Sequence, residues 1–216
     1  MTARLDDTTP LEFYRRARES VQATFGAELS WQATRELRHI TESDLLRESA
    51  WVILCSGFRE AIVRRYFPYL SICFCEWESA AAICHNATVC RETAMSCFKN
   101  IRKIDAIVKT AFLVHEVGFE TFRDQIIHDP VSALRRLPYI GDVTGFHLAK
   151  NLGAEVAKPD RHLVRCAVSF GFEDVQVLCS MLAAETGDSV SVVDLVLWRY
   201  LEQQQAVDSA KPPNRM

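Results

Sequence analysis

The sequence predicts an all-α protein, and three observations support that class. Apolar residues recur at helical spacing along most of the chain, as they do over 10–25 in Leu11, Tyr14, Ala17, Val21 and Phe25. Only 8 glycines and 7 prolines occur in 216 residues, which is few for a β protein with many tight turns. No two alternating apolar segments flank a short turn in the way that a β-hairpin requires.

The predicted helices follow one another along the chain. The first spans 10–25 and begins at Pro10, and the second is a long helix over 43–66 with Ser43 as its N-cap. Further helices are predicted over 80–84, 89–98, 101–117, 119–127 and 131–136. A helix over 142–152 comes next, and the last helix, capped by Ser191 or Asp194, runs to Leu201. We expect the polar segment 203–216 to be a disordered tail.

Composition excludes several classes of protein. With 49% hydrophobic residues the chain is too apolar to be disordered, and it is long enough for one large core or two lobes. No run approaches the ~18 apolar residues of a membrane span, and the N-terminus carries no secretory signal. We therefore expect a cytoplasmic protein with no membrane partner. The net charge of −3 gives no general attraction to nucleic acid, although clusters such as 161–165 can form a local basic face.

The eight cysteines are predicted to be reduced core residues, because most of them lie in apolar helical stretches and no pair has C-x-x-C spacing. Cys84, His85 and Cys90 are the strongest candidates for metal ligands. They supply only three donors at irregular spacing, and helix packing explains the cysteines equally well. We predict no metal site.

The segment Leu137-Pro138-Tyr139-Ile140-Gly141 lies between two predicted helices and has the form of a tight hairpin. Such a hairpin directs several backbone N–H groups, with the positive end of the second helix, at one point, where they can bind a phosphate oxygen. The candidate DNA-binding residues are Tyr139, Ile140, Gly141, Val143 and Thr144. The alternative is that the hairpin only joins two packed helices.

A second motif, Lys158-Pro159-Asp160-Arg161-His162-Leu163-Val164-Arg165, follows the hairpin. The pattern L-P-x-[IV]-G-x-x-T, then D-x-H-φ-x-R about 16 residues later, resembles the signature of the helix-hairpin-helix DNA glycosylase superfamily. The amino-acid sequence of this segment is most similar to that of prokaryotic and phage members. The resemblance implies a two-lobed fold, with a six-helix lobe over 45–155 and a second lobe made of 1–44 and 156–202. It places the active cleft between these lobes.

The resemblance identifies Asp160 as the catalytic residue. Cleavage of a nucleoside C1′–N bond builds positive charge on the sugar, and a nearby carboxylate stabilises that charge and orients the nucleophile. An alternative role for Asp160 is an N-cap, because it precedes a predicted helix. The two roles are compatible. His162 belongs to the same motif and is expected to orient the loop.

Two departures from the superfamily pattern narrow the expected chemistry. Members with lyase activity have a lysine two residues after the last hairpin glycine, where this chain has Val143. Lys150 lies seven residues further along, about two helical turns away, and is not expected to replace it. Only Cys166 and Cys179 follow Asp160, so we expect no iron–sulfur cluster and no other cofactor. A monofunctional enzyme that uses water as the nucleophile is predicted.

The sequence also offers candidates for the residues around the flipped base. Where many relatives carry a residue that fills the gap left by the flipped base, this chain has Ser56, Gly57 and Phe58. Phe58 is either an aromatic wedge or a core residue, and Gly57 can leave room for a bulky base. Trp51, Trp77 and Trp198 are mainly candidates for the core, and an aromatic from this set, such as Trp51, is a candidate for stacking on the flipped base.

The sequence therefore predicts a monomeric DNA glycosylase that acts on double-stranded DNA with a damaged or modified base. One alternative is removal of hypermodified phage bases, in antiviral defence or phage DNA modification. Another is a non-catalytic helix-hairpin-helix module in which Asp160 only caps its helix.

Overall fold

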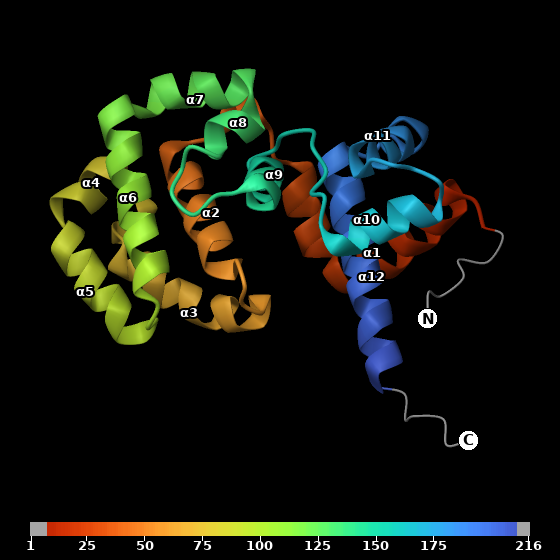
Figure 1. The fold of residues 1–216 in the computed structure, drawn as a ribbon, viewed down its shortest axis with the longest axis horizontal. Helices are drawn as coiled ribbons and strands as arrows, with labels where there is room; N and C mark the ends of the chain where they lie inside the picture. The colour runs from red at the N-terminus through yellow and green to blue at the C-terminus, as the bar shows by residue number, and fades with distance from the viewer. Residues whose placement is uncertain (1–7, 211–216) are drawn as a thin grey trace. The chain divides into compact units, whose positions relative to one another are not determined.

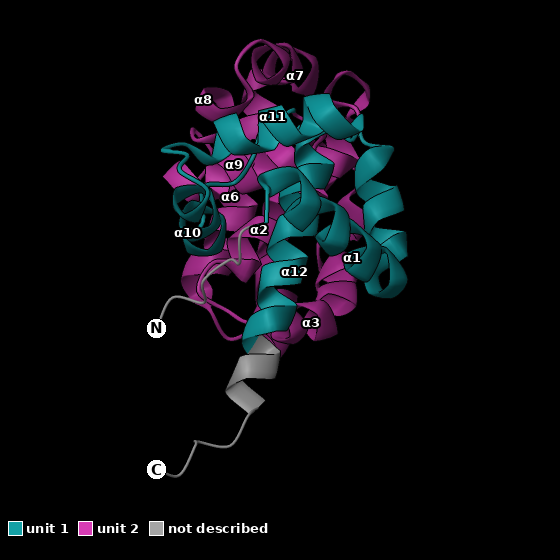
Figure 2. Ribbon diagram, turned by 90° about the vertical axis from the view of Figure 1, so that its right-hand side faces the viewer, with its two compact units in different colours: residues 1–35, 155–216 teal, residues 36–154 magenta. Residues whose placement is uncertain are grey.

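The computed structural model describes residues 8–210, with side chains through residue 205. The regular elements in that range are all helices, so the all-α prediction is confirmed. None of the described helices combines the length and the hydrophobicity needed to cross a bilayer. The chain divides into two compact units, which Figure 2 shows in two colours. The middle unit consists of residues 36–154, and the terminal unit consists of 1–35 with 155–216.

The middle unit is built around α6. Its elements are η1 (Leu37–His39), α2 (Glu42–Cys55), α3 (Glu60–Cys73), η2 (Cys75–Trp77), α4 (Ala80–His85), α5 (Ala87–Cys97), α6 (Ile101–Val117), α7 (Phe119–His128), α8 (Pro130–Leu134) and α9 (Asp142–Asn151). Helix α6 packs against α2, α4 and α5 (Figure 1). Its buried face carries Ile104, Ile107, Ala111 and Val114, spaced three or four residues apart.

The terminal unit contains α1 (Pro10–Ala33), α10 (Arg161–Ser169), α11 (Val175–Thr186) and α12 (Val190–Ala210). Helices α1 and α12 pack side by side, and α10 and α11 both contact α12 (Figure 1). Thr9 and Glu12 form a capping box that begins α1. The buried core of this unit includes Phe13, Ala17 and Val21 from α1 and Val193, Val196 and Leu197 from α12.

Several predicted boundaries differ from the structure. The stretch 43–66 is two helices, because Gly57 has a φ of +76°, a left-handed conformation that ends a helix and favours glycine. Thr41, not Ser43, caps α2 in a capping box with Asp44. At α12, the Ser189 hydroxyl accepts from the Val192 amide at 3.3 Å, so neither Ser191 nor Asp194 is the cap.

Two further differences concern the ends of the predicted regions. Residues 203–210, predicted to be disordered, continue helix α12. The glutamines and alanine that follow Glu202 are good helix formers, so the polar composition does not stop the helix. Residues 211–216 lie outside the described residues. The middle unit begins at 36 rather than 45, because η1 and the capping box at Thr41 belong to it.

Candidate active site

Asp160 is the N-cap of α10. Its Oδ1 accepts from the backbone N–H groups of His162 at 2.9 Å and Leu163 at 3.1 Å. Its Oδ2 lies 3.8 Å from Nζ of Lys158, and the Asp160 side chain is 13% exposed. One carboxylate oxygen therefore holds the helix terminus while the other contacts a cation. The carboxylate is held at a helix N-terminus, where a negative charge is favourable, and it is still partly accessible.

The segment that leads to Asp160 is fixed by side chains from two helices. The Ala157 N–H donates to Oε1 of Gln176 on α11 at 2.8 Å. The Lys158 N–H donates to Oδ2 of Asp194 on α12 at 2.7 Å, and Asp194 is buried. Glu155 accepts from the Val190 N–H at 2.7 Å, which ties the start of the segment to the start of α12. Each bond restricts the backbone that carries Asp160.

His162 lies on the first turn of α10, beside the catalytic candidate. Its Nδ1 is 2.9 Å from Nε2 of Gln205, and its Nε2 accepts from Nε of Arg161 at 3.3 Å. The imidazole thus contacts α12 through Gln205. Its contacts agree with a role in positioning α10, and that role stays a prediction.

The hairpin lies in the middle unit, between α8 and α9. Gly141 is the N-cap of α9, and its N–H donates to Oγ1 of Thr144 at 2.7 Å. The first amide with an intrahelical acceptor is that of Gly145, which donates to the Gly141 carbonyl at 2.8 Å. The amides of Asp142, Val143 and Thr144 precede it at the helix N-terminus, where amide hydrogens lack intrahelical partners. This is the arrangement that can bind an anion.

Tyr139 is the residue of the hairpin with a strained backbone. Tyr139 has a φ of +71°, which is unfavourable for a non-glycine residue. Gly141 has a φ of −109°, which any residue can adopt, and a Cβ there would come no closer than 4.0 Å to Oγ1 of Thr144. Gly141 therefore leaves open space above the hairpin, while the fold itself does not require glycine there.

Charged side chains also flank the hairpin. Asp142, at the first position of α9, would repel a phosphate, but its carboxylate is paired with the guanidinium of Arg135. Ile140 is buried and fixes the hairpin to the core, whereas Tyr139 is 45% exposed. Val143 is also exposed. Lys150 is only 6% exposed, so its amine does not project from the surface of α9.

Of the predicted pocket residues, Ser56, Gly57 and Phe58 lie at the α2–α3 connection of the same unit, and Trp51 lies in α2. Phe58 is 39% exposed, and its ring lies 5.4 Å from that of Phe98. A Cβ added at Gly57 would meet no atom within 4 Å, so this point of the loop is open. The Trp51 ring makes an edge contact with Phe67 at 5.1 Å and lies under the guanidinium of Arg64 at 5.4 Å. Trp51 thus packs against α3, and a stacking role for it remains a prediction.

Lys103 is a residue of this region whose role the sequence analysis missed. It lies in the first turn of α6, is 1% exposed, and its Nζ donates to the carbonyls of Ile53 and Ser56. The bond to Ser56 is 2.7 Å long. The sequence did contain a signal for the burial of Lys103. Ile107 follows it by four residues and Thr110 follows Ile107 by three, so the three share one face of α6, and that face is buried.

The cysteines and histidines provide no metal centre in the part of the chain that the structure describes, where no three metal-binding side chains converge. Cys90 contacts Cys75, with the two sulfur atoms 3.9 Å apart. Burial beside Cys75 and Cys73 raises the pKa of the Cys90 thiol to about 12, so it is protonated at neutral pH.

Comparisons with known proteins place the fold. No family model and no curated protein matches the sequence. Among solved structures, the chain is similar to the crystal structure of the 8-oxoguanine DNA glycosylase of Thermotoga maritima, with a TM-score of 0.57 and 20% sequence identity. The match covers 87% of this chain and 93% of that chain. The chain therefore has the all-α fold of a DNA glycosylase.

Proposed function

We propose that this protein is a DNA glycosylase that flips a damaged or modified base out of duplex DNA and hydrolyses its N-glycosidic bond. The observation that carries the proposal is the Asp160 carboxylate, held at the N-terminus of α10 by two backbone N–H groups on one oxygen. A capping role needs only that oxygen. The second oxygen is turned to Lys158 and is free of the cap. The likeness in fold to a solved DNA glycosylase supports the same proposal.

In the proposed reaction, Asp160 faces C1′ of the flipped nucleotide. As the C1′–N bond lengthens, positive charge grows on the sugar, and the fixed carboxylate stabilises it without having to reorganise. The same carboxylate orients a water molecule and accepts a proton as the water attacks C1′. A barrier reduction of about 3–4 kcal/mol, or 10²–10³ in rate, is typical of one fixed electrostatic group.

The hairpin provides the proposed DNA anchor. Three amides at the start of α9 and the open space at Gly141 let a phosphate approach the backbone closely, with no basic side chain required. This explains how a protein with a net charge of −3 binds a polyanion. Because phosphate contacts carry no sequence information, the anchor serves any duplex, and the choice of base belongs to the pocket.

The proposed nucleophile is water. Val143 occupies the lyase position with an aliphatic side chain, and the Lys150 amine is buried. The product of the proposed reaction is an intact strand with an abasic site.

A mass-spectrometric screen for released bases tests the function. The wild type and Asp160→Asn are incubated with undamaged duplex, with duplexes containing uracil, alkylated purines or 8-oxoguanine, and with hypermodified phage DNA. Release of a free base by the wild type alone supports the proposal and names the substrate. Duplex binding without release from any substrate would instead establish a DNA-binding module in which Asp160 is only a cap.

Hypermodified bases form the second candidate substrate class. The observation that favours them is the open space at Gly57, where even an added Cβ would meet no atom within 4 Å. Release from phage DNA but from no damaged duplex would assign the enzyme to that class.

A further inference from the structure

A buried ammonium group links the two segments of the middle unit that are proposed to contact DNA. Lys103 Nζ donates to the carbonyls of Ile53 and Ser56, at the C-terminal end of α2. Asn100 caps α6 and accepts from the Lys103 backbone N–H at 3.3 Å, which fixes the residue in the first turn. A positive charge at a helix C-terminus is favourable, because the last carbonyls carry partial negative charge.

The same ammonium contacts two aromatic rings. Its Nζ lies 4.7 Å from the ring centre of Tyr139 in the hairpin and 5.4 Å from that of Phe58 in the α2–α3 loop. These distances are within the range of cation–π attraction, which is strongest where water is excluded. Both rings are partly exposed, so each has surface left to meet a ligand. One buried cation therefore contacts the phosphate-anchoring hairpin and the candidate wedge together.

A lysine in this place has a cost that packing alone does not explain. Burial lowers the pKa of Lys103 to about 8, because an ammonium is poorly solvated inside a protein. The hydrogen bonds to the Ile53 and Ser56 carbonyls offset part of that cost, because the last carbonyls of a helix lack intrahelical partners. An apolar residue at this position would avoid that cost, but it would remove this donor from the two carbonyls and lose the contacts with both rings.

We propose that Lys103 is a positioning residue that holds the α2–α3 loop (Ser56, Gly57 and Phe58) and the hairpin (137–141) at a fixed separation. This inference rests on the proposed function. The hairpin sets where the duplex backbone lies, and a wedge enters the base stack only if its distance from that anchor is fixed. Gly57 turns the chain with a left-handed backbone, and the Lys103 hydrogen bond to the Ser56 carbonyl holds the residue directly before that turn.

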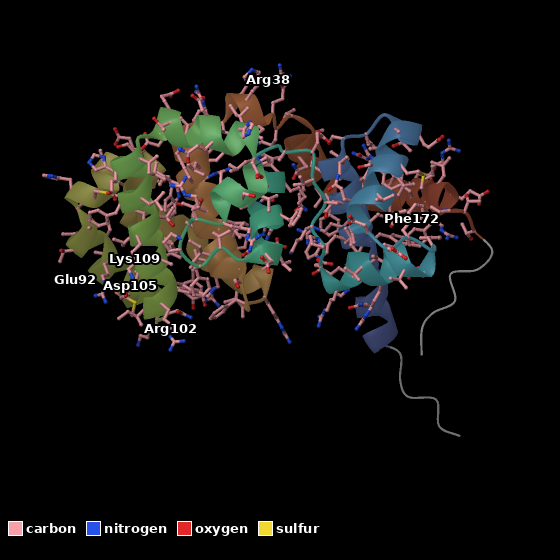
Figure 3. The ribbon with its side chains drawn as sticks, turned by 45° about the horizontal axis from the view of Figure 1, so that its top comes forward. Arg38, Glu92, Arg102, Asp105, Lys109 and Phe172 are labelled. Atoms are coloured by element: carbon pink, nitrogen blue, oxygen red, sulfur yellow. The ribbon has the colours of Figure 1, made fainter. Side chains whose placement is uncertain are left out.

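The test compares Lys103→Met with Lys109→Met. Methionine retains the length of the side chain but lacks the charge and the N–H donors. Lys109 lies on the same helix, is exposed, and appears near Asp105 in Figure 3, so its substitution removes the same charge away from the clamp. Three quantities are measured for each protein: the melting temperature, the affinity for undamaged duplex, and the single-turnover rate of base release.

Lys103→Met is expected to fold and to bind undamaged duplex within about twofold of the wild type, because the hairpin amides remain. Its rate of base release is expected to fall at least about tenfold, which corresponds to ~1.4 kcal/mol of barrier. Lys109→Met is expected to retain the wild-type rate. This separation of affinity from rate is the result that a merely structural role would not produce. If Lys103→Met fails to fold, Lys103→Gln, which keeps N–H donors but no charge, carries the same comparison.

Wild-type rates in the folded Lys103 variants would overturn the positioning role and leave the proposed function standing. Equal losses of affinity and of rate would also overturn it, since the residue would then serve binding alone. If the wild type releases no base from any substrate in the screen, the proposed function fails, and the positioning role falls with it.

Discussion

Asp160 has two candidate roles, and two substitutions separate them. Asp160→Asn removes the negative charge but keeps an oxygen that can accept from the His162 and Leu163 amides. Asparagine is as good an N-cap as aspartate. Asp160→Ala removes the charge and the cap together. A role in capping alone predicts that only the alanine variant is impaired, whereas catalysis predicts that both are inactive.

The magnitudes differ enough to be measured. Loss of an N-cap that accepts two backbone hydrogen bonds costs about 1 kcal/mol, or ~2–4 °C in Tm for a chain of this size. The asparagine variant keeps the cap but loses the favourable charge at the helix N-terminus, about 0.3–1 kcal/mol, and the ion pair with Lys158. Loss of the catalytic carboxylate lowers the rate of base release by at least about 10²-fold. The rate effect of Asp160→Asn is therefore far larger than its effect on folding.

Asp174 provides the matched control. It is the N-cap of α11 in the same unit, and its carboxylate accepts from the Gln176 amide at 2.8 Å. Asp174→Ala should lower Tm by about as much as Asp160→Ala, because both remove an N-cap. It should leave base release within a few fold of the wild type.

The assay is single-turnover release of the base identified by the screen, with duplex affinity and Tm measured on the same samples. Affinity of Asp160→Asn should equal or exceed that of the wild type, since a negative charge near phosphates is lost. If Asp160→Asn retained turnover within about tenfold of the wild type, the catalytic role would be refuted. The cap would then be the whole function of the residue.

Three further predictions concern the product, the anchor and the buried lysine. If Val143 occupies the lyase position, as proposed, and because Lys150 is buried, the product strand should break only after alkali or heat. Covalent trapping of the enzyme on DNA by borohydride would contradict this. Gly141→Val should weaken binding to all duplexes alike while changing the free energy of unfolding by less than about 1 kcal/mol, because its φ of −109° suits any residue; unchanged binding, measured by titration, would reduce the hairpin to a structural turn. Burial lowers the pKa of Lys103 from 10.5 to about 8, so between these values the unfolded chain binds a proton that the folded chain does not. The free energy of unfolding of the wild type should therefore rise relative to that of Lys103→Met between pH 8 and 10.5, by up to about 3 kcal/mol. If denaturant unfolding gave parallel curves of stability against pH for the two proteins, the ammonium would not be desolvated.

Local signals in the sequence predicted much of the fold. The bounds of α6, α7 and α9 agree with the predicted helices to within about a residue, because a capping residue or a glycine marks their ends. The prediction failed where two helices are joined without a break in the apolar pattern. Over 43–66 the side chains continue at helical spacing, and only the left-handed backbone at Gly57 divides the stretch.

The candidate site could be predicted in part for a similar reason. Asp160 and the hairpin each lie in a short motif, so their local conformation depends on residues that are neighbours in the sequence. The contacts that hold them come from distant positions. Asp194 reaches the Lys158 amide across 36 residues, and Lys103 reaches Ser56 across 47. Periodicity places Lys103 on a buried face, but it gives no information about which carbonyls and rings face it.

The division of the chain into two units explains why the short segment from the hairpin to Asp160 is so informative about function. The hairpin belongs to the middle unit and Asp160 to the terminal unit, and the boundary falls between Ala154 and Glu155. If the proposed function is correct, the anchor for the phosphate and the carboxylate for the sugar are separated by only 18 residues, from Asp142 to Pro159, although each is fixed by the core of its own unit. The short segment that spans the boundary therefore contains both the proposed phosphate anchor and the proposed catalytic carboxylate. The residues that select the base are under no such constraint, because the side chains that line a pocket can come from positions far apart in the sequence. Those residues are accordingly the part of the site that the base-release screen, rather than the motif, must identify.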